Sequence, residues 1–520
     1  MGGVRALADA FALIGALNYA FISDSGLGAA GASALAEGLS KSSVTFLDVA
    51  QNGILEEGKR ALGEALADQS SKAVLSFITV DEWTILPGTQ SLDFSDAKLT
   101  VGDLTLLGAV LSCGESVKTV ELARCELGAK KDKSGVNALA KAFTRSPSVT
   151  ALNISGNGIR ISDLQILAPA MSKLTSLNLS GNAFGGRFVE RERDVRRQAH
   201  RGTVFSTAQN ATRHTVLRQT SNDVEWDTEI EREWVVDMAG VRALAEVIRL
   251  SPTLVSIDLS DNGFGPTGVE ALGLSVSQST SLTSLDLGKN SIGGYFSPKH
   301  GWRNHGQVGV KALATAITTS TSLRVLGLAN NHLIGINDEG QGEYDLAGLR
   351  MLCGPLSTST TITALDLSDN GFGPEGAKLV ATAMKKNMSL VELNISQNEV
   401  CFSEERSGIK AIALAVKACQ KLNHLTIARS KLPIQDLKTE PMIDLSQESA
   451  NLVLEDAIIV ATCISVNTSL RTLNIRGHSF TDEAKRALRS AARLKPDLEV
   501  VGDMGKLTDA EVKGSSCTIQ

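Results

Sequence analysis

The sequence is poor in aromatic residues and lacks a strong excess of either charge. Only 4% of its 520 residues are Phe, Trp or Tyr, and 57 Asp and Glu stand against 51 Lys and Arg. A formal charge of −6 gives no basic excess of the kind that nucleic-acid-binding proteins carry, so we expect no nucleic-acid partner. With 42% hydrophobic and 21% charged residues, the composition excludes both a disordered and a membrane-embedded class.

Long apolar runs and paired cysteines are also scarce. The longest uncharged apolar stretches, such as residues 457–466, are too short for a membrane helix, so no transmembrane span is expected. The seven cysteines are an odd number without CxxC spacing, which excludes a disulfide framework or zinc module and favours a reducing compartment. We therefore expect a cytoplasmic protein, with a cytoskeletal, ciliary or membrane-peripheral location left open.

No established catalytic motif occurs. The sequence contains no GxxxxGK[ST] phosphate loop, no HExxH pair and no GxSxG elbow. His300 and His305 are the nearest approach to a metal-ligand pair, and a surface pair is the favoured interpretation. We therefore expect no catalytic residue, no metal site and no cofactor.

The sequence contains an internal repeat instead. Segments 174–185, 254–265, 282–293 and 362–373 share the pattern LxxLxLxxNxL, with Phe or Ile allowed at the last apolar position. Weaker copies bring the number to thirteen, and uninterrupted neighbours are 28 residues apart, as between Leu254 and Leu282. A fixed period of this length is the signature of a solenoid, in which each unit buries its apolar face against the next.

Each unit combines the period of a strand with the period of a helix. Leu177 and Leu179 alternate with polar residues, which predicts a short strand with one buried face. The apolar residues of 240–249 then fall on one stripe with a period of 3.6, which predicts a helix. A strand and a helix in a right-handed crossover predict an α/β solenoid with parallel strands on its concave face and helices on its convex face.

An Asn follows the strand in most repeats, where the chain bends. Its side-chain amide can satisfy backbone groups that the strand leaves open, so stacked copies are expected to form a polar ladder. This position holds Asn52, Asn157, Asn182, Asn262, Asn290, Asn331, Asn370 and Asn398. It departs from Asn at Ser25, Ala97, Cys125, Ser430 and His478, and Ala97 and His478 indicate less regular turns.

These repeats resemble those of the leucine-rich repeat family, and their 28-residue helical spacing is similar to that of its ribonuclease-inhibitor-like subclass. The resemblance covers nearly the whole chain and implies a horseshoe over residues 1–501, followed by a flexible tail, 502–520. Insertions near 186–236, 294–308, 334–345 and 433–452 break the period between the bend and the helix. We expect all four to project from one edge, where loops on a rigid scaffold commonly bind.

The largest insertion is basic in its first part and acidic in its second. One interpretation is a disordered, self-neutralising loop. The other is a docking arm with Trp anchors, because Trp and Arg are over-represented at binding hot spots. The candidate binding residues in the insertions are Arg196, Arg197, Trp226, Trp234, Tyr295 and Trp302.

The residue between the two strand leucines of each repeat is expected to face the concave side. In no repeat is this residue Lys or Arg, so the face is expected to be acidic and to favour a basic or polar partner. The resemblance also implies the plainer interpretation that Asp and Asn are ordinary at this position. The candidate binding residues here are Asp48, Asp93, Glu121, Asp258, Asp286 and Asp366.

The last four residues, 517–520, fit the C-a-a-X prenylation pattern with Cys517 as the acceptor. No polybasic run or second Cys supplies a second anchor, so only weak membrane association is expected from it. The alternative is an exposed terminal thiol without a role.

Because the resemblance is to a family used mostly for binding, it implies a non-enzymatic scaffold for an unidentified protein partner, alone or as a subunit of a larger assembly. The alternative is a small-GTPase regulator, because one branch of this subclass looks like Ran GTPase-activating proteins. Arg160 stands after the bend at Asn157, where that branch presents its catalytic Arg, but this match is positional only. GTP turnover with and without the chain distinguishes the two classes.

Overall fold

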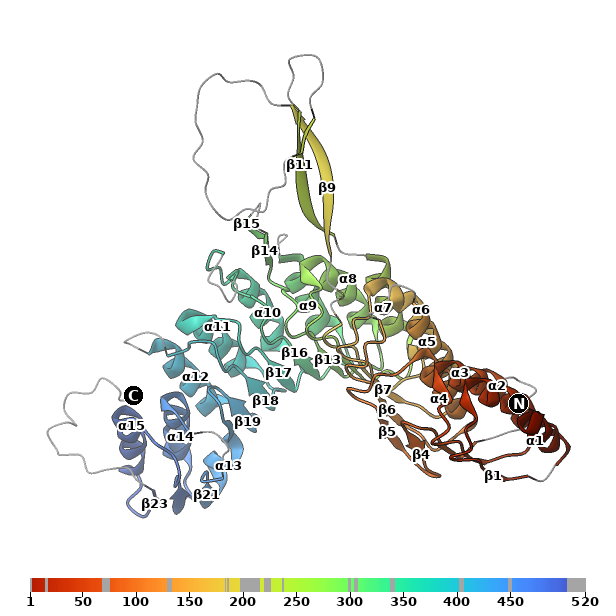
Figure 1. Cartoon of the computed structure of the whole chain (residues 1–520). Coiled ribbons are helices and arrows are strands. Elements are labelled where there is room, and N and C mark those ends of the chain that lie inside the picture. The colour runs from red at the N-terminus through yellow and green to blue at the C-terminus, as the bar shows by residue number, and fades with distance from the viewer. Residues whose placement is uncertain are drawn as a thin grey trace.

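The computed structural model describes residues 2–14, 17–67, 75–128, 133–182, 184, 187–196, 216–218, 226–235, 238–297, 301–303, 307–336, 342–401, 406–447 and 451–502. Figure 1 shows these residues as an arch with its helices on the outer side and its strands on the inner side. The expected α/β class, in which parallel strands alternate with helices, is confirmed.

Three parallel sheets of short strands line the inner side of the arch. The N-terminal sheet contains β1 (Tyr19–Phe21), β2 (Phe46–Asp48) and β3 (Phe77–Thr79). The central sheet contains β5 (Ser91–Asp93), β6 (Thr119–Glu121), β7 (Ala151–Asn153), β8 (Ser176–Asn178), β12 (Ser256–Asp258), β13 (Ser284–Asp286), β16 (Val325–Gly327), β17 (Ala364–Asp366), β18 (Glu392–Asn394) and β19 (His424–Thr426). The C-terminal sheet contains β21 (Met442–Asp444), β22 (Thr472–Asn474) and β23 (Glu499–Val501).

The helices stack in chain order along the outer side. They are α1 (Gly2–Leu13), α2 (Gly28–Ser40), α3 (Leu55–Leu66), α4 (Val101–Cys113), α5 (Ser134–Arg145), η1 (Ile161–Asp163), α6 (Leu164–Met171), α7 (Met238–Leu250), α8 (Gly265–Gln278), α9 (Val308–Thr319), α10 (Ala347–Thr358), α11 (Gly373–Lys386), α12 (Ser407–Ala418), α13 (Ile434–Thr439), α14 (Leu454–Val466) and α15 (Asp482–Ala492). Small residues set their spacing. A Cβ on Gly38 of α2 would lie 2.2 Å from the carbonyl oxygen of Ala8 in α1.

The buried core lies between the strands and the helices. The middle residue of the parallel strands, such as Leu47, Ile257 or Leu393, is buried in all but β23, and its neighbours on the strand are partly open to the concave side in all but β16, where Gly327 is buried. This alternation confirms the predicted one-sided strand. These middle residues belong to one buried core with the apolar stripes of the helices. In α7 that stripe consists of Val241, Leu244 and Ile248.

The predicted Asn ladder is present. In seven successive repeats, from Asn157 to Asn398, the backbone N–H of one Asn donates to Oδ1 of the next, at 2.9–3.2 Å. The amide of Asn290 also donates to the carbonyl oxygens of Leu259, Leu287 and Gly288. The ladder therefore satisfies backbone groups of two neighbouring repeats at once.

Two departures from Asn reproduce part of this bonding. Sγ of Cys125 donates to the carbonyl oxygen of Phe94 at 3.0 Å. Nε2 of His478 lies 2.7 Å from the carbonyl oxygen of Leu445, at the same point of the preceding repeat. The thiol and the imidazole thus contact the carbonyl oxygen that the Asn amide contacts in other repeats. The hydrogen bonding of the turn at His478 is therefore more regular than its sequence predicts.

The run of parallel strands along the arch is interrupted twice, between the N-terminal and central sheets and between the central and C-terminal sheets. A short antiparallel strand lies at each interruption. β4 (Thr84–Ile85) pairs with β3, and β20 (Lys431–Pro433) pairs with β19. The segment 433–452, an insertion by its sequence, contains α13 and β21, which adds a strand in parallel to β22. That expectation is wrong because Glu440 and Glu448 stand where the pattern has its first Leu and its Asn, so the sequence does not mark β21 as a strand of a repeat. β3 and β23 lack the Asn as well.

A buried ion pair spans the first interruption. Nζ of Lys59, in α3, lies 2.9 Å from Oδ1 of Asp103, in α4, and also bonds Glu82. Nε1 of Trp83 donates to the same Asp103 oxygen at 3.0 Å, and Thr100 donates to its other oxygen. Lys59 and Asp103 are only 2% and 4% exposed, so this cluster joins the N-terminal sheet and its helices to the central ones.

The largest insertion, between β8 and α7 in the chain, contains an antiparallel ribbon that rises from the outer side of the arch (Figure 1). Its strands are β9 (Arg187–Arg196), β10 (Val216–Arg218) and β11 (Trp226–Val235). The register places Arg191 opposite Glu231 and Arg193 opposite Glu229, so the basic and acidic parts pair with each other. The described residues of the insertion are therefore paired strands rather than a loop, and the self-neutralising part of the first interpretation agrees with their register. The next insertion forms a hairpin of β14 (Tyr295–Ser297) and β15 (Gly301–Arg303).

Candidate functional site

The six concave candidates lie at the last positions of their strands, as the repeat predicts. Asp258, Asp286 and Asp366 are on β12, β13 and β17 of the central sheet, with Gly327 of β16 between the last two. We call these three carboxylates the acidic row. Asp93 and Glu121 are a register pair at the opposite end of the same sheet. Asp48 is on β2 of the N-terminal sheet and stands apart from them.

The repeat has a structural use for these side chains. Oδ1 of Asp258 accepts from the backbone N–H of Ser260 at 2.9 Å, and Asp286 and Asp366 accept likewise from Gly288 and Ser368. Asn178 makes the same bond to Ser180. Asp and Asn are therefore equivalent for the turn, and only the charge distinguishes them.

The acidic row disfavours the ionised form of its central member, Asp286. Burial raises the pKa of Asp286, and the neighbouring charges of Asp258 and Asp366 raise it further, against the bond from Gly288. A Cβ on Gly327 would lie 2.5 Å from Oδ1 of Asp286, so the missing side chain leaves room for that carboxylate. A cation placed beside Asp286 would relieve this repulsion.

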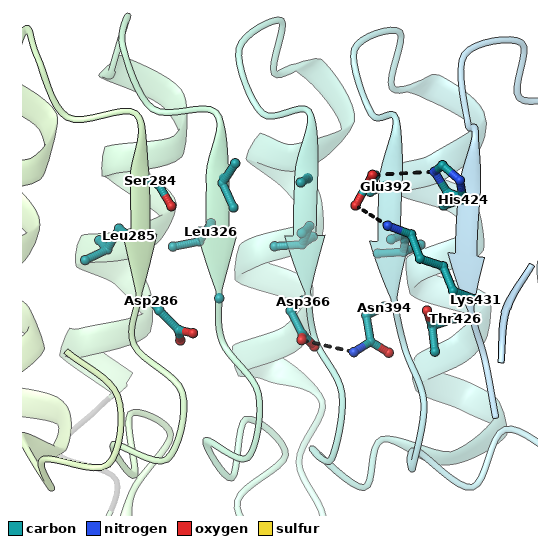
Figure 2. Close-up of a pocket in the computed structure, with 15 residues that line it drawn as sticks. Ser284, Leu285, Asp286, Leu326, Asp366, Glu392, Asn394, His424, Thr426 and Lys431 are labelled. Carbon is teal, nitrogen blue, oxygen red and sulfur yellow. Dashed lines mark hydrogen bonds and ion pairs between the residues drawn. The ribbon is translucent and has the colours of Figure 1, made fainter. Parts of the chain in front are cut away.

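Asp286 and Asp366 of the acidic row line a hollow of about 360 Å³ on the concave face, between β13 and β20. Figure 2 shows Leu285 and Leu326 at the middle of their strands and polar groups towards both strand ends. Asp366 accepts from Nδ2 of Asn394 at 3.0 Å at one end. At the other, Glu392 contacts Nζ of Lys431 at 3.0 Å and Nδ1 of His424 at 3.4 Å.

Sequence reasoning missed Lys431 and His424. Lys431 lies outside the repeat pattern and reaches the concave face only because β20 folds back antiparallel on β19. His424 occupies the first strand position, whereas the sequence analysis examined the position between the leucines. It also missed Tyr19, Phe46 and Phe77 in that first position of the N-terminal sheet.

The insertion candidates lie on the ribbon and the hairpin. Arg196 of β9 is the register partner of Trp226 of β11, so the structure brings these two positions together. Trp234 pairs with Phe188, eight residues further along β11. On the hairpin, Tyr295 pairs with Arg303, and Trp302 pairs with Phe296. The structure describes the backbone alone at these positions.

Two candidates fall outside the described residues. They are Arg197, in the largest insertion, and Cys517, in the tail beyond Gly502. Binding by Arg197 and prenylation of Cys517 therefore stay predictions. Among the residues that the structure describes, no group of three or more His, Cys, Asp or Glu is arranged to hold a metal ion. None of the described helices combines the length and apolar character that crossing a bilayer requires.

Comparison with known proteins finds leucine-rich repeats in the chain. A family model described as "Leucine Rich repeat" matches residues 170–187, 250–273, 278–294, 358–381 and 466–488. The matched segments include β8, β12, β13 and β17 with their Asn turns, and β22 with the turn at His478. The repeat that the sequence shows is thus the leucine-rich repeat, and the ribonuclease-inhibitor-like subclass is a finer assignment that this match does not make.

Individual similarities are partial. The chain is 30% identical over 129 residues to a Rho GTPase-activating protein, gacW, of Dictyostelium discoideum, and spans only 11% of that relative's length. A solved structure of Leiomodin-1 Actin-Binding Site 2 is 22% identical, with 23% of this chain and 61% of that chain covered and a TM-score of 0.19. The TLR13–ssRNA13 complex is 14% identical, with 91% of this chain and 47% of that chain covered and a TM-score of 0.32.

Proposed function

We propose that the chain is a non-enzymatic scaffold that holds another protein against its concave face and its insertion-bearing edge. The observation that carries the proposal is the acidic row beside the open hollow of the central sheet. Each carboxylate of the row completes a turn that Asn completes equally well in other repeats, so its negative charge is not required by the fold. Such a face favours a partner that presents Lys or Arg.

The scaffold interpretation also fits the arrangement of the insertions. The ribbon and the hairpin leave the arch after β8 and β13 of the central sheet, which β12 separates, and at the same point of the repeat. A partner seated on the concave face of β8 to β17 therefore lies on strands from which both insertions leave. Leucine-rich repeats with one helix per strand also support our assignment of the ribonuclease-inhibitor-like subclass.

Neutralising the acidic row tests this proposal. We expect the triple substitution Asp258→Asn, Asp286→Asn and Asp366→Asn to weaken capture of the stoichiometric partner from native lysate by about tenfold or more, because complementary charge is lost while the turn bonds remain. The measurement is quantitative mass spectrometry of affinity-purified complexes.

The matched control removes three charges from the convex side. Glu246→Gln, Glu270→Gln and Glu375→Gln change exposed residues of α7, α8 and α11 by the same net amount. A variant lacking residues 187–235 tests the insertion edge separately. If the concave and convex triple variants lost partner capture equally, net charge alone would explain the effect. That result would overturn the assignment of binding to the concave face.

A GTPase regulator is the second candidate, favoured by the activity in the name of the Dictyostelium relative. In the structure Arg160 is exposed just before η1, and its backbone N–H donates to Asp163 at 3.1 Å. We expect GTP turnover by Rho-type and Ran-type GTPases to be unchanged when the chain is added. An acceleration that Arg160→Ala abolishes would replace the scaffold proposal with this one.

A further inference from the structure

A row of aromatic side chains crosses the concave face of the N-terminal sheet. Tyr19, Phe46 and Phe77 occupy the first positions of β1, β2 and β3, which the register pairs with one another. The ring centroids of Tyr19 and Phe46 are 4.6 Å apart, and those of Phe46 and Phe77 are 5.6 Å apart. We call these three side chains the aromatic row. Phe21, two residues along β1, stacks on Tyr19 at 6.4 Å.

The fold does not need these rings where they stand. Tyr19 is 56% exposed and Phe21 is 66% exposed, while Phe46 and Phe77 are half-buried. The same strand position in the central sheet is small on seven strands, at Ser91, Thr119, Ala151, Ser176, Ser256, Ser284 and Ala364. Neighbouring exposed rings in a chain this poor in aromatics are typical of an interaction surface.

Acidic groups lie along one side of the aromatic row. Asp48 ends β2, and Asp24 and Asp81 follow β1 and β3 in the turns beyond the strands. The strand and turn segments 19–25, 46–53 and 77–83 contain no Lys or Arg. A ligand lying on the row would therefore meet apolar rings beneath it and negative charge along one flank.

We infer that the aromatic row binds an amphipathic helix of a partner protein, with an apolar stripe on the rings and Lys or Arg along the Asp48 flank. The spacing supports a helix that lies across the strands. Rings 4.6 Å and 5.6 Å apart match the helical pitch of about 5.4 Å, so side chains on successive turns meet successive rings. The inference uses the N-terminal sheet alone, so it can fail while the proposal for the acidic row stands, and the reverse.

A labelled peptide tests this inference on the full chain. The probe is a helix of about 18 residues, or five turns, with a Leu stripe and Lys along one flank, and its binding is read by fluorescence anisotropy. A second peptide carries Glu in place of the Lys residues. We expect the basic peptide to bind, and the affinity of the acidic peptide to be lower by about tenfold or more.

Substitutions taken from other repeats keep the fold intact. Phe46→Ser places at β2 the residue found at Ser256 and Ser284, and we expect it to weaken binding about tenfold or more. Asp48→Asn keeps the acceptor for the N–H of Ala50 and should weaken binding less, with a smaller dependence on salt. Thr119→Ser, at the same position in β6, is the matched control.

Three outcomes would overturn the inference. The first is no binding of the basic peptide to the unmodified chain, and the second is equal binding by the Phe46→Ser variant with an unchanged melting temperature. The third is self-association of the chain, measured by sedimentation, that Phe46→Ser abolishes. That result would assign the aromatic row to contact with a second copy.

Discussion

The Lys59→Ala substitution is expected to lower the free energy of unfolding by about 3–5 kcal/mol. Lys59 and Asp103 are both almost fully buried, and their charged atoms are 2.9 Å apart. Removing the ammonium leaves the Asp103 carboxylate buried with Trp83 and Thr100 as its hydrogen-bond donors. An unpaired buried charge costs far more than the pair gains, so the loss is large.

The position of the pair predicts where the damage appears. It joins α3, behind the N-terminal sheet, to α4, behind the central sheet, across the interruption at β4. We expect amide hydrogen exchange to rise more in α2 and α3 than in α8 and α9. The control is Lys41→Ala, which removes an exposed pair with Glu37 and should cost less than about 0.5 kcal/mol. Equal effects of the two substitutions would show that Lys59 does not hold this junction.

The stabilisation should depend on pH in a defined way. Burial alone would raise the pKa of Asp103, but bonds from Lys59, Thr100 and Trp83 hold it below 3.8. Burial alone would lower the pKa of Lys59, but bonds to Glu82 and Asp103 raise it above 10.5. The Asp103 contribution is present above pH 3.8 and is lost as pH falls through its folded pKa. The Lys59 contribution is present below pH 10.5 and is lost as pH rises through its folded pKa.

The difference in unfolding free energy between the unmodified chain and Lys59→Ala should narrow above pH 10.5, as Lys59 loses its proton. It should also narrow on the acid side, because burial raises the pKa of Asp103 once Lys59 is removed and protonation then relieves the variant. Urea unfolding followed by circular dichroism at a series of pH values measures the difference, and a difference that stays constant at acid and alkaline pH would contradict an ion pair as its source.

The second large effect is expected from Asn290→Ala, at about 3 kcal/mol or more. The side chain is fully buried, donates to three carbonyl oxygens and accepts from the backbone N–H groups of Asn262 and Phe264 at 3.2 Å. Each buried backbone group left without a partner costs about 1–3 kcal/mol, and five groups are involved, some of which keep other partners. Equilibrium urea denaturation measures the loss.

Two further variants distinguish the effect of losing the ladder hydrogen bonds from the effect of replacing an Asn anywhere in the chain. Asn290→Asp keeps the acceptor but places a buried carboxylate against the three carbonyl oxygens, so we expect a loss at least as large as that of Asn290→Ala. Asn137→Ala changes an exposed Asn of α5 and should alter stability by no more than about 0.5 kcal/mol. If Asn290→Ala were as mild as Asn137→Ala, the ladder would not be a source of stability.

Much of the fold is predictable from the sequence because the repeat marks its own strands. The Leu pairs identified thirteen strands, eight of which are followed by the Asn, and missed β3, β21 and β23. Their pairing follows from the stacking of neighbouring repeats, which a single segment does not reveal. The α/β class and the concave position of the acidic row were predictable for the same reason.

The remaining features depend on contacts between distant residues. Tyr19, Phe46 and Phe77 are separated by 27 and 31 residues and become neighbours only through the register of three strands. Lys59 occurs in an amphipathic helix, where a Lys is normally exposed, and its burial depends on Asp103 and Trp83 beyond the next strand. No periodicity in the sequence carries that information.

Site-specific photo-crosslinking tests the central claim most directly. A photoreactive amino acid is placed at Ser284 on the concave face, at Ser297 on the hairpin, or at Thr315 on the convex face of α9. Each full-length variant is irradiated in native lysate and its adducts are identified by mass spectrometry. We predict one common partner crosslinked from Ser284 and Ser297 and not from Thr315. A partner crosslinked from Thr315 and from neither of the other positions would contradict the account.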